Sequence, residues 1–274
     1  MTLTRTQVVD LLERHGLRPS RALGQNFVAD PNTIRRIVRL AEIGPGSHVV
    51  EIGPGVGSLT TELAATGAEV VAVELDRHLL PVLAETVEPL GVRVVHADAR
   101  TADWDVLLAG AMRWSLVANL PYNVATTIVL ELLDRVPAIT EMLVMVQREV
   151  GERLAASVGT SAWGIPSVKL CLWARAEVVA RVPSTVFVPQ PRVESVLVRI
   201  VRLDRPAVDV DPESLMELVR AAFGQRRKML RRSLAGVVTT EQFAAAGIDP
   251  SERPERLTVA QWGALTTVVG DSRR

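Results

Sequence analysis

Short apolar runs alternate with amphipathic stretches along the first half of the chain. The apolar runs are rich in β-branched residues and carry few charges, which is typical of buried strands. They occupy residues 47–53, 68–76, 92–100, 114–120 and 141–150, the last of which runs on into a helical pattern. Between the runs, apolar residues recur at helical spacing, as at Leu59, Leu63 and Ala64. This alternation predicts a doubly wound α/β fold with a mostly parallel sheet.

The pattern changes in the second half. Two longer apolar stretches, 168–182 and 195–203, flank the proline-rich segment VPSTVFVPQPRVES. We interpret both as further strands that complete the sheet edge. After a linker at 204–213, the remaining patterns are helical with no strand between them. The sequence therefore predicts an α/β domain over residues 1–205 and a small all-helical domain over residues 206–274.

Composition narrows the class of protein. The chain has 274 residues, of which 48% are apolar, enough for one large domain and a small one. The N-terminus lacks a signal-peptide pattern and no run suits a membrane span, so we expect a cytoplasmic protein with no membrane partner. The single cysteine, Cys171, permits no internal disulfide and no thiolate metal cluster, and no metal site is predicted.

A basic cluster lies in the predicted helical domain. It consists of Arg226, Arg227, Lys228, Arg231 and Arg232. The chain has 31 basic and 31 acidic residues and a net charge of zero, so this positive charge is local. In a helix, such spacing would spread the charge over more than one face. The cluster is either a solvated helix face or a surface that contacts nucleic-acid phosphates.

Glycine and polar residues follow four successive predicted strands. They are Gly53 and Gly55 in the loop E-I-G-P-G-V-G, then Glu74, Asp98 and Asn119. In an open parallel sheet, ligands bind beyond the carboxyl ends of the strands. Glycines let the backbone approach a ligand, Glu74 can bind ribose hydroxyls and Asp98 can accept from an adenine amino group. Each residue alone is compatible with a turn, but together they predict a nucleotide-like cofactor.

The glycine spacing distinguishes between cofactors. The chain lacks the G-x-x-x-x-G-K-[S/T] loop of ATP-binding proteins and the G-x-G-x-x-G that dinucleotide-binding folds normally show. An acid, alternating glycines and a glutamate on the next strand resemble the Rossmann-like S-adenosylmethionine-dependent methyltransferases. Their cofactor has a ribose and an adenine but no phosphate, which suits acids around the site. The resemblance implies S-adenosyl-L-methionine as the cofactor.

Four further stretches make the resemblance narrower. They are LGQNFV, NLPY, FVPQPRVES and FGQRRKMLRRSL. Together, over essentially the whole chain, they resemble the ribosomal RNA adenine N6-dimethyltransferase family, and within it the branch that dimethylates two adjacent adenosines near the 3′ end of small-subunit rRNA. The resemblance implies cofactor contacts at Asn26 and Val28, RNA contacts in the basic cluster, and rRNA within a pre-ribosomal 30S particle as the partner. It implies no obligate protein partner, and we expect a monomer.

The NLPY stretch offers a chemistry for adenine N6, which is a poor nucleophile because its lone pair is delocalised into the ring. The side-chain oxygen of Asn119 and the carbonyl of Leu120 can accept its N–H groups, which favours a tetrahedral nitrogen and its growing positive charge. Pro121 would fix the turn, and Tyr122 would stack on a base taken out of its helix. The resemblance implies that Phe187 stacks from the opposite side; the alternative is a core residue.

Some features depart from the family pattern. Trp163 stands where the family usually has tyrosine, Arg232 where it usually has asparagine, and the net charge is low for an RNA-binding enzyme. Two alternatives stay open: a macrolide-resistance methyltransferase of large-subunit rRNA, and a ribosome-assembly or RNA-binding factor in which catalysis is dispensable. The basic cluster and the long C-terminal domain favour the small-subunit enzyme.

Overall fold

The computed structural model describes residues 2–20 and 22–272, and the chain divides into two compact units. The first unit comprises Met1–Gly151 and Glu177–Arg202, and the second comprises Glu152–Ala176 and Leu203–Arg274. A single boundary near residue 205 is expected from the sequence, whereas the chain passes between the units three times.

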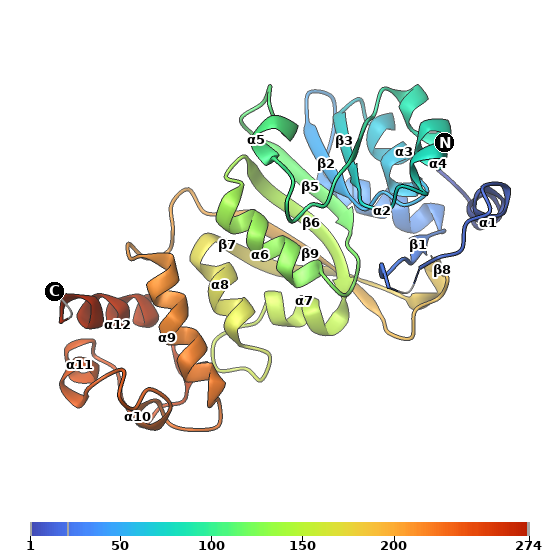
Figure 1. Ribbon diagram of the computed structural model, residues 1–274. Coiled ribbons are helices and arrows are strands. Elements are labelled where there is room, and N and C mark those ends of the chain that lie inside the picture. The colour runs from blue at the N-terminus through green and yellow to red at the C-terminus, as the bar shows by residue number, and fades with distance from the viewer. Residues whose placement is uncertain (1, 21, 273–274) are drawn as a thin grey trace. The chain divides into compact units, whose positions relative to one another are not determined.

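Seven strands form the central sheet. They are β2 (His48–Ile52), β3 (Glu69–Glu74), β4 (Arg93–His96), β5 (Trp114–Asn119), β6 (Ile139–Gln147), β7 (Ala174–Val182) and β9 (Ser195–Arg202). Their order across the sheet is β4-β3-β2-β5-β6-β9-β7 (Figure 1). The pairs β2–β3, β2–β5, β3–β4 and β5–β6 are parallel, and β9 is antiparallel to β6. The mostly parallel α/β sheet expected from the sequence is confirmed.

The following helices and 3₁₀ turns accompany these strands, and the last of the helices runs from the first unit into the second. They are α1 (Arg5–Arg14), α2 (Pro31–Ala41), α3 (Ser58–Ala65), α4 (Leu80–Thr86), α5 (Trp104–Leu107), α6 (Ala125–Arg135) and α7 (Arg148–Leu154), with the 3₁₀ turns η1 (Glu88–Leu90) and η2 (Ser184–Val186). Because side chains alternate along a strand, residues such as Val49 and Val117 share one core with Ile34 of α2 and Leu63 of α3. A separate two-residue ladder pairs β1 (Phe27–Val28) with β8 (Phe187–Val188).

The C-terminal end of α6 is fixed by a half-buried guanidinium. Arg202, the last residue of β9, donates hydrogen bonds to the carbonyl oxygens of Leu132, Leu133, Val136 and Ile139. The last carbonyls of a helix have no partner within it, so a cation at this position satisfies them. This contact matters for the site, because α6 begins directly after the NLPYN loop.

The second unit is helical. It contains α8 (Ile165–Trp173), α9 (Pro212–Gly224), α10 (Leu230–Ser233), α11 (Thr240–Ala245), the 3₁₀ turn η3 (Pro254–Arg256) and α12 (Val259–Asp271). Trp262 of α12 and Val219 of α9 are fully buried in its core, together with Trp163 and Leu172 from the inserted segment. Among the described residues, no helix combines the length and the apolar character that a membrane crossing needs.

The strand expected at 168–182 is wrong in its first third. Residues up to Trp173 form α8, and only Ala174–Val182 form β7. A buried helix and a buried strand are both continuously apolar, so periodicity does not separate them here. The deciding feature is local: Pro166 suits a first helical turn, and the Ser167 hydroxyl accepts from the backbone N–H of Gly164 at 3.1 Å.

Candidate active site

A cavity of about 360 Å³ lies at the carboxyl ends of the parallel strands in the first unit. Its wall joins residues that are far apart in the sequence, as a doubly wound sheet allows. The residues singled out from the sequence that line it are Asn26, Val28, Gly53, Gly55, Glu74, Asp98, Asn119 and Pro121. Leu120, Tyr122 and Phe187 do not belong to its lining.

The loop after β2 requires glycine. Gly53, Gly55 and Gly57 have φ angles of 70°, 62° and 87°, in the left-handed region that side chains disfavour. A Cβ on Gly55 would lie 2.6 Å from the ring of Phe27. The backbone therefore stays bare where it lines the cavity, and a ligand can approach it closely.

Glu74, the last residue of β3, holds this loop. Its Oε2 accepts from the N–H of Gly55 at 3.3 Å, and its Oε1 accepts from the N–H of Asp76 at 2.8 Å. Burial raises the pKa of the Glu74 carboxyl, while the two backbone donors oppose that shift. Glu74 thus lines the cavity and also holds the glycine loop in position.

A second buried acid faces the cavity and is not among the expected site residues. Glu51 of β2 is 2% exposed, lines the cavity, and its Oε2 has no hydrogen-bond partner among the described residues. Burial raises its pKa to about 8, and the nearby charge of Glu74 adds to the shift. The signal in the sequence is a glutamate inside the strand HVVEI, because an acid is costly in a buried strand unless a ligand or partner uses it.

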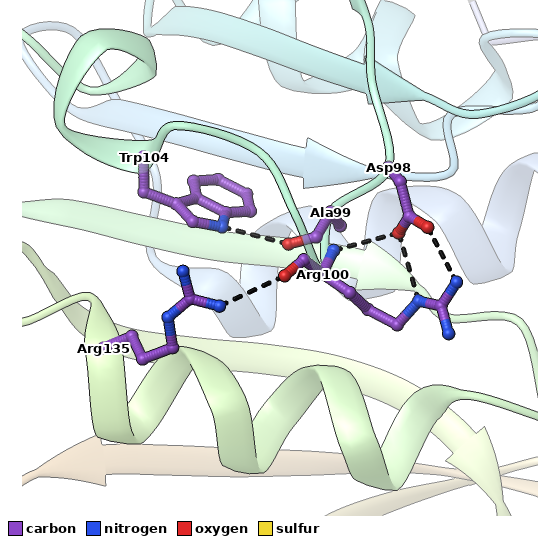
Figure 2. Close-up of polar contacts among 5 residues, drawn as sticks. All are labelled: Asp98, Ala99, Arg100, Trp104 and Arg135. Carbon is purple, nitrogen blue, oxygen red and sulfur yellow. Dashed lines mark hydrogen bonds and ion pairs between the residues drawn. The ribbon is translucent and has the colours of Figure 1, made fainter.

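Asp98 follows β4 and is bound by Arg100. Its Oδ1 accepts from the backbone N–H and the Nε of Arg100, at 3.0 and 3.2 Å, and its Oδ2 accepts from Nη2 at 2.7 Å. Figure 2 shows this chelate, in which Arg100 contacts both carboxylate oxygens of Asp98. It also shows the side chains of Trp104 and Arg135, which donate to the backbone carbonyls of Ala99 and Arg100. The hydrogen bonds from Arg100 lower the pKa of the Asp98 carboxyl, which therefore stays ionised. Both residues line the cavity.

Asn119 ends β5 with one half of its amide satisfied. Its Nδ2 donates to the carbonyl oxygen of Asn26 at 2.9 Å, which sets the direction of the amide. Its Oδ1 is buried at the cavity and has no partner among the described residues. A buried acceptor without a donor is unfavourable, so this oxygen is suited to accept an N–H from a ligand.

The residues after Asn119 form a tight turn into α6. The backbone N–H of Leu120 donates to the carbonyl of Met145 at 3.1 Å, and the Leu120 side chain is buried. The carbonyl of Pro121 accepts from the N–H groups of Val124 and Ala125, at 3.2 and 3.0 Å. The turn is therefore anchored to the sheet on one side and to the first turn of α6 on the other.

Tyr122 is held by a residue that lies far from it in the sequence. Its hydroxyl lies 2.7 Å from the Oγ of Ser195, which is fully buried at the start of β9 and ends the FVPQPRVES stretch. Burial raises the pKa of Tyr122, so the ring is neutral. The hydrogen bond fixes the position of the hydroxyl end of the ring, and Ser195 is a second functional candidate that sequence reasoning did not single out.

Phe187 is expected from the family resemblance to stack on a target base. Its side chain has no exposed surface and belongs to the core beneath β1, where Phe187 pairs with Val28. This burial favours the core alternative, and the stacking of this ring on a target base stays a prediction. Pairing of β8 with β1 buries Phe187. Because β1 is far away in the sequence, no local sequence pattern indicates this pairing.

The basic cluster belongs to the second unit and lies largely outside helices. Residues 225–229 connect α9 to α10, so Arg226, Arg227 and Lys228 lie outside helices, whereas Arg231 and Arg232 lie in the short helix α10. Arg226 is used internally: its Nη2 donates to the carbonyl of Ser161 at 2.8 Å and its Nε lies 3.8 Å from the carboxylate of Glu255. The exposed members are Arg227, Lys228, Arg231 and Arg232.

Comparison with known proteins places these features in a family. Residues 17–269 match the family described as "Ribosomal RNA adenine dimethylase". The ribosomal RNA small subunit methyltransferase A of Geobacillus kaustophilus is 42% identical over 275 residues, covering 95% of this chain and 94% of that protein. Its counterpart in Kineococcus radiotolerans is 46% identical over 274 residues, covering 96% and 90%.

Solved structures agree. The 23S rRNA methyltransferase ErmE is 27% identical with a TM-score of 0.70, covering 89% of this chain and all of that one. A dimethyladenosine transferase from Plasmodium falciparum shares the fold, with a TM-score of 0.74 at 20% identity, covering 87% of this chain and 95% of that one. The family match and the two small-subunit relatives extend over nearly the whole chain, and this chain therefore belongs to the ribosomal RNA adenine dimethylase family.

Proposed function

We propose that this protein is an S-adenosyl-L-methionine-dependent adenine N6-dimethyltransferase. Its substrate would be two adjacent adenosines near the 3′ end of small-subunit rRNA in a pre-ribosomal 30S particle, and the enzyme would act as a cytoplasmic monomer. The observation that carries the proposal is the buried Oδ1 of Asn119, an acceptor without a donor at the edge of a cavity built from four strand ends.

The cavity fits the proposed cofactor. Bare backbone at Gly53 and Gly55, ionised Asp98 and the unpartnered Oε2 of Glu51 suit a ligand with an adenine, ribose hydroxyls and an ammonium group. Glu74 would accept hydrogen bonds from the ribose hydroxyls. Asn26 and Val28 would complete the contacts; all of these residues line the cavity. When bound, S-adenosyl-L-methionine supplies an electrophilic methyl group.

The turn after β5 would prepare the acceptor nitrogen. The Oδ1 of Asn119 and the carbonyl of Leu120 accept its two N–H groups, which favours a tetrahedral nitrogen with a localised lone pair. No strong base is needed, because the amino protons become acidic only as the new bond forms. Tyr122 would stack on the extruded base, and Ser195 would hold the hydroxyl end of the ring in position. Phe187 has no exposed surface to offer.

The substrate is tested by presenting both ribosomal subunits. Unmethylated small subunits and large subunits are incubated separately with the protein and methyl-labelled cofactor, and the labelled base is mapped. We expect label on two adjacent adenines of small-subunit RNA. Label on large-subunit RNA alone would assign the activity of ErmE, the relative at 27% identity. No label on either subunit would favour an assembly factor that does not need catalysis.

Removing the Ser195 hydroxyl is expected to slow methyl transfer without affecting the cofactor. Ser195→Ala deletes one hydrogen bond to Tyr122, and a bond of that kind contributes about 1 kcal/mol, so kcat falls roughly five- to tenfold. Tyr122→Phe should have the same effect, and the double variant should be no slower than either single variant, because both changes remove one contact. Effects that multiply in the double variant would show that Ser195 acts elsewhere. Calorimetric cofactor affinity serves as the control.

The exposed part of the basic cluster is expected to contact rRNA phosphates. Arg227→Ala with Lys228→Ala should weaken binding to small-subunit RNA, and the slope of log K against log salt should become shallower by about 1.4–1.8. Arg226→Ala is the matched control: it removes an internal contact to Ser161, so it should lower thermal stability with little change in slope. Equal slopes for the double variant and the wild type would exclude phosphate contacts at these two residues.

A further inference from the structure

Arg100 occupies three of the four acceptor positions of Asp98. Each carboxylate oxygen offers two lone pairs. Oδ1 uses both, for the backbone N–H and the Nε of Arg100, whereas Oδ2 uses one, for Nη2 at 2.7 Å. One lone pair of Oδ2 is left over. In Figure 2 the Nε–Nη2 edge of the guanidinium faces the carboxylate, so its remaining N–H groups point away from Asp98.

The backbone that carries this chelate is also fixed. The carbonyl of Ala99 accepts from the indole Nε1 of Trp104 at 3.0 Å, and the carbonyl of Arg100 accepts from Nη1 of Arg135 at 3.2 Å (Figure 2). The N–H groups of residues 101 and 102 donate to the carbonyl of Asp98. Each side of the pair is thus tied to its surroundings, so the carboxylate has a set orientation before any ligand arrives.

We propose that Arg100 is a positioning residue that turns Asp98 into an acceptor for a single N–H, and so gives the cavity its preference for the 6-amino group of the cofactor's adenine. The inference rests on the proposed function and extends it to a residue outside the strand-end pattern. An ionised carboxylate with one open lone pair matches one amino N–H. It repels a purine that carries a carbonyl at the same position, because two acceptors would then meet.

Without the guanidinium, the same aspartate would be less selective. Its side chain could rotate, and only the lone pair that accepts from the backbone N–H of residue 100 would stay occupied, which leaves the others open to water or to other donors. A hydrogen bond to an ionised group discriminates by roughly 10- to 100-fold when its geometry is fixed, and by much less when solvent competes. Arg100 and Asp98 are partly exposed, with side-chain accessibilities of 47% and 24%, so orientation rather than burial must supply the selectivity.

The test compares two probes by calorimetry: S-adenosylhomocysteine and its analogue with hydrogen in place of the 6-amino group. We expect the wild type to prefer the amino probe by at least about tenfold. Arg100→Met keeps an unbranched apolar stem but removes the chelate, so the preference should fall to about twofold. Arg100→Lys pairs with only one carboxylate oxygen and should be intermediate.

Two controls separate the possible failures. Arg77→Met removes an exposed arginine that does not line the cavity and should leave the preference unchanged. Asp98→Ala should abolish the preference, and adding Arg100→Met to it should change nothing further. An Arg100→Met protein that folds and keeps the wild-type preference would overturn the role of Arg100 while leaving the proposed function intact. A wild type that binds neither probe would overturn the proposed cofactor and this inference together.

Discussion

Asn119→Ala is expected to reduce methyl transfer by at least about 10²- to 10³-fold while leaving RNA binding largely intact. The substitution removes a buried acceptor at the cavity that has no donor among the described residues. A preorganised hydrogen-bonding group that acts on charge developing in a transition state contributes a factor of that order. The measurement is kcat on unmethylated small subunits, together with binding of the same RNA.

Asn123→Ala is the matched control for Asn119. It lies in the same turn, has the same side chain and also lines the cavity, but its side chain is exposed and its amide Nδ2 donates to the carbonyl of Ala22 at 3.1 Å. It should change kcat by less than about tenfold, because it touches no developing charge. If Asn119→Ala turned over at the wild-type rate, the amide would have no part in the reaction and the proposed mechanism would be wrong.

Glu51→Gln is expected to make the protein more stable at pH 8 and to flatten its pH dependence. Burial raises the pKa of Glu51 from its ordinary value of 4.5 to about 8. Between these values the unfolded chain releases the proton while the folded chain keeps it, so wild-type stability falls as the pH rises. Each unit is about 1.4 kcal/mol, which gives an effect on the order of a few kcal/mol by pH 8. Glutamine has no proton to release.

The measurement is urea unfolding of wild type and variant at pH 5 and pH 8. The two proteins should have similar midpoints at pH 5, and the variant should be clearly more stable at pH 8. Glu85→Gln is a useful control, because hydrogen bonds from His15 and Arg14 lower the pKa of that exposed carboxyl and it stays ionised over the range. Parallel pH profiles for wild type and Glu51→Gln would mean that Glu51 is ionised in the folded protein.

The cavity was within reach of the sequence because parallel strands bring their carboxyl ends to one edge. Once the strands are recognised, Gly53, Glu74, Asp98 and Asn119 must lie near each other, whatever the helices do. The cavity lining confirms that placement. Asn26 came only from family resemblance, since it precedes the first strand of the central sheet and follows no periodic pattern. Its contact with Asn119 joins residues 93 positions apart.

Other features depend on tertiary contacts that no local pattern records. Phe187 lies beside a proline-rich loop in sequence, but pairing of β8 with β1 buries it. Ser195 reads as the start of a strand, and its partner Tyr122 is 73 residues away. The charge of Arg226 suggests an exposed surface, yet Ser161 and Glu255 engage it inside the second unit. In each case the sequence shows the residue type but not the distant residue that it contacts in the fold.

The discontinuous second unit affects how the protein can be divided or recombined. A cut near residue 205 leaves residues 152–176 on the α/β part, where Trp163, Val168 and Leu172 would lose the helices that cover them. A chimera between two relatives would inherit mismatched halves of one core if it exchanged only the C-terminal segment. Residues 152–176 and 203–274 therefore have to be exchanged together. Substitutions in one segment constrain those tolerated in the other.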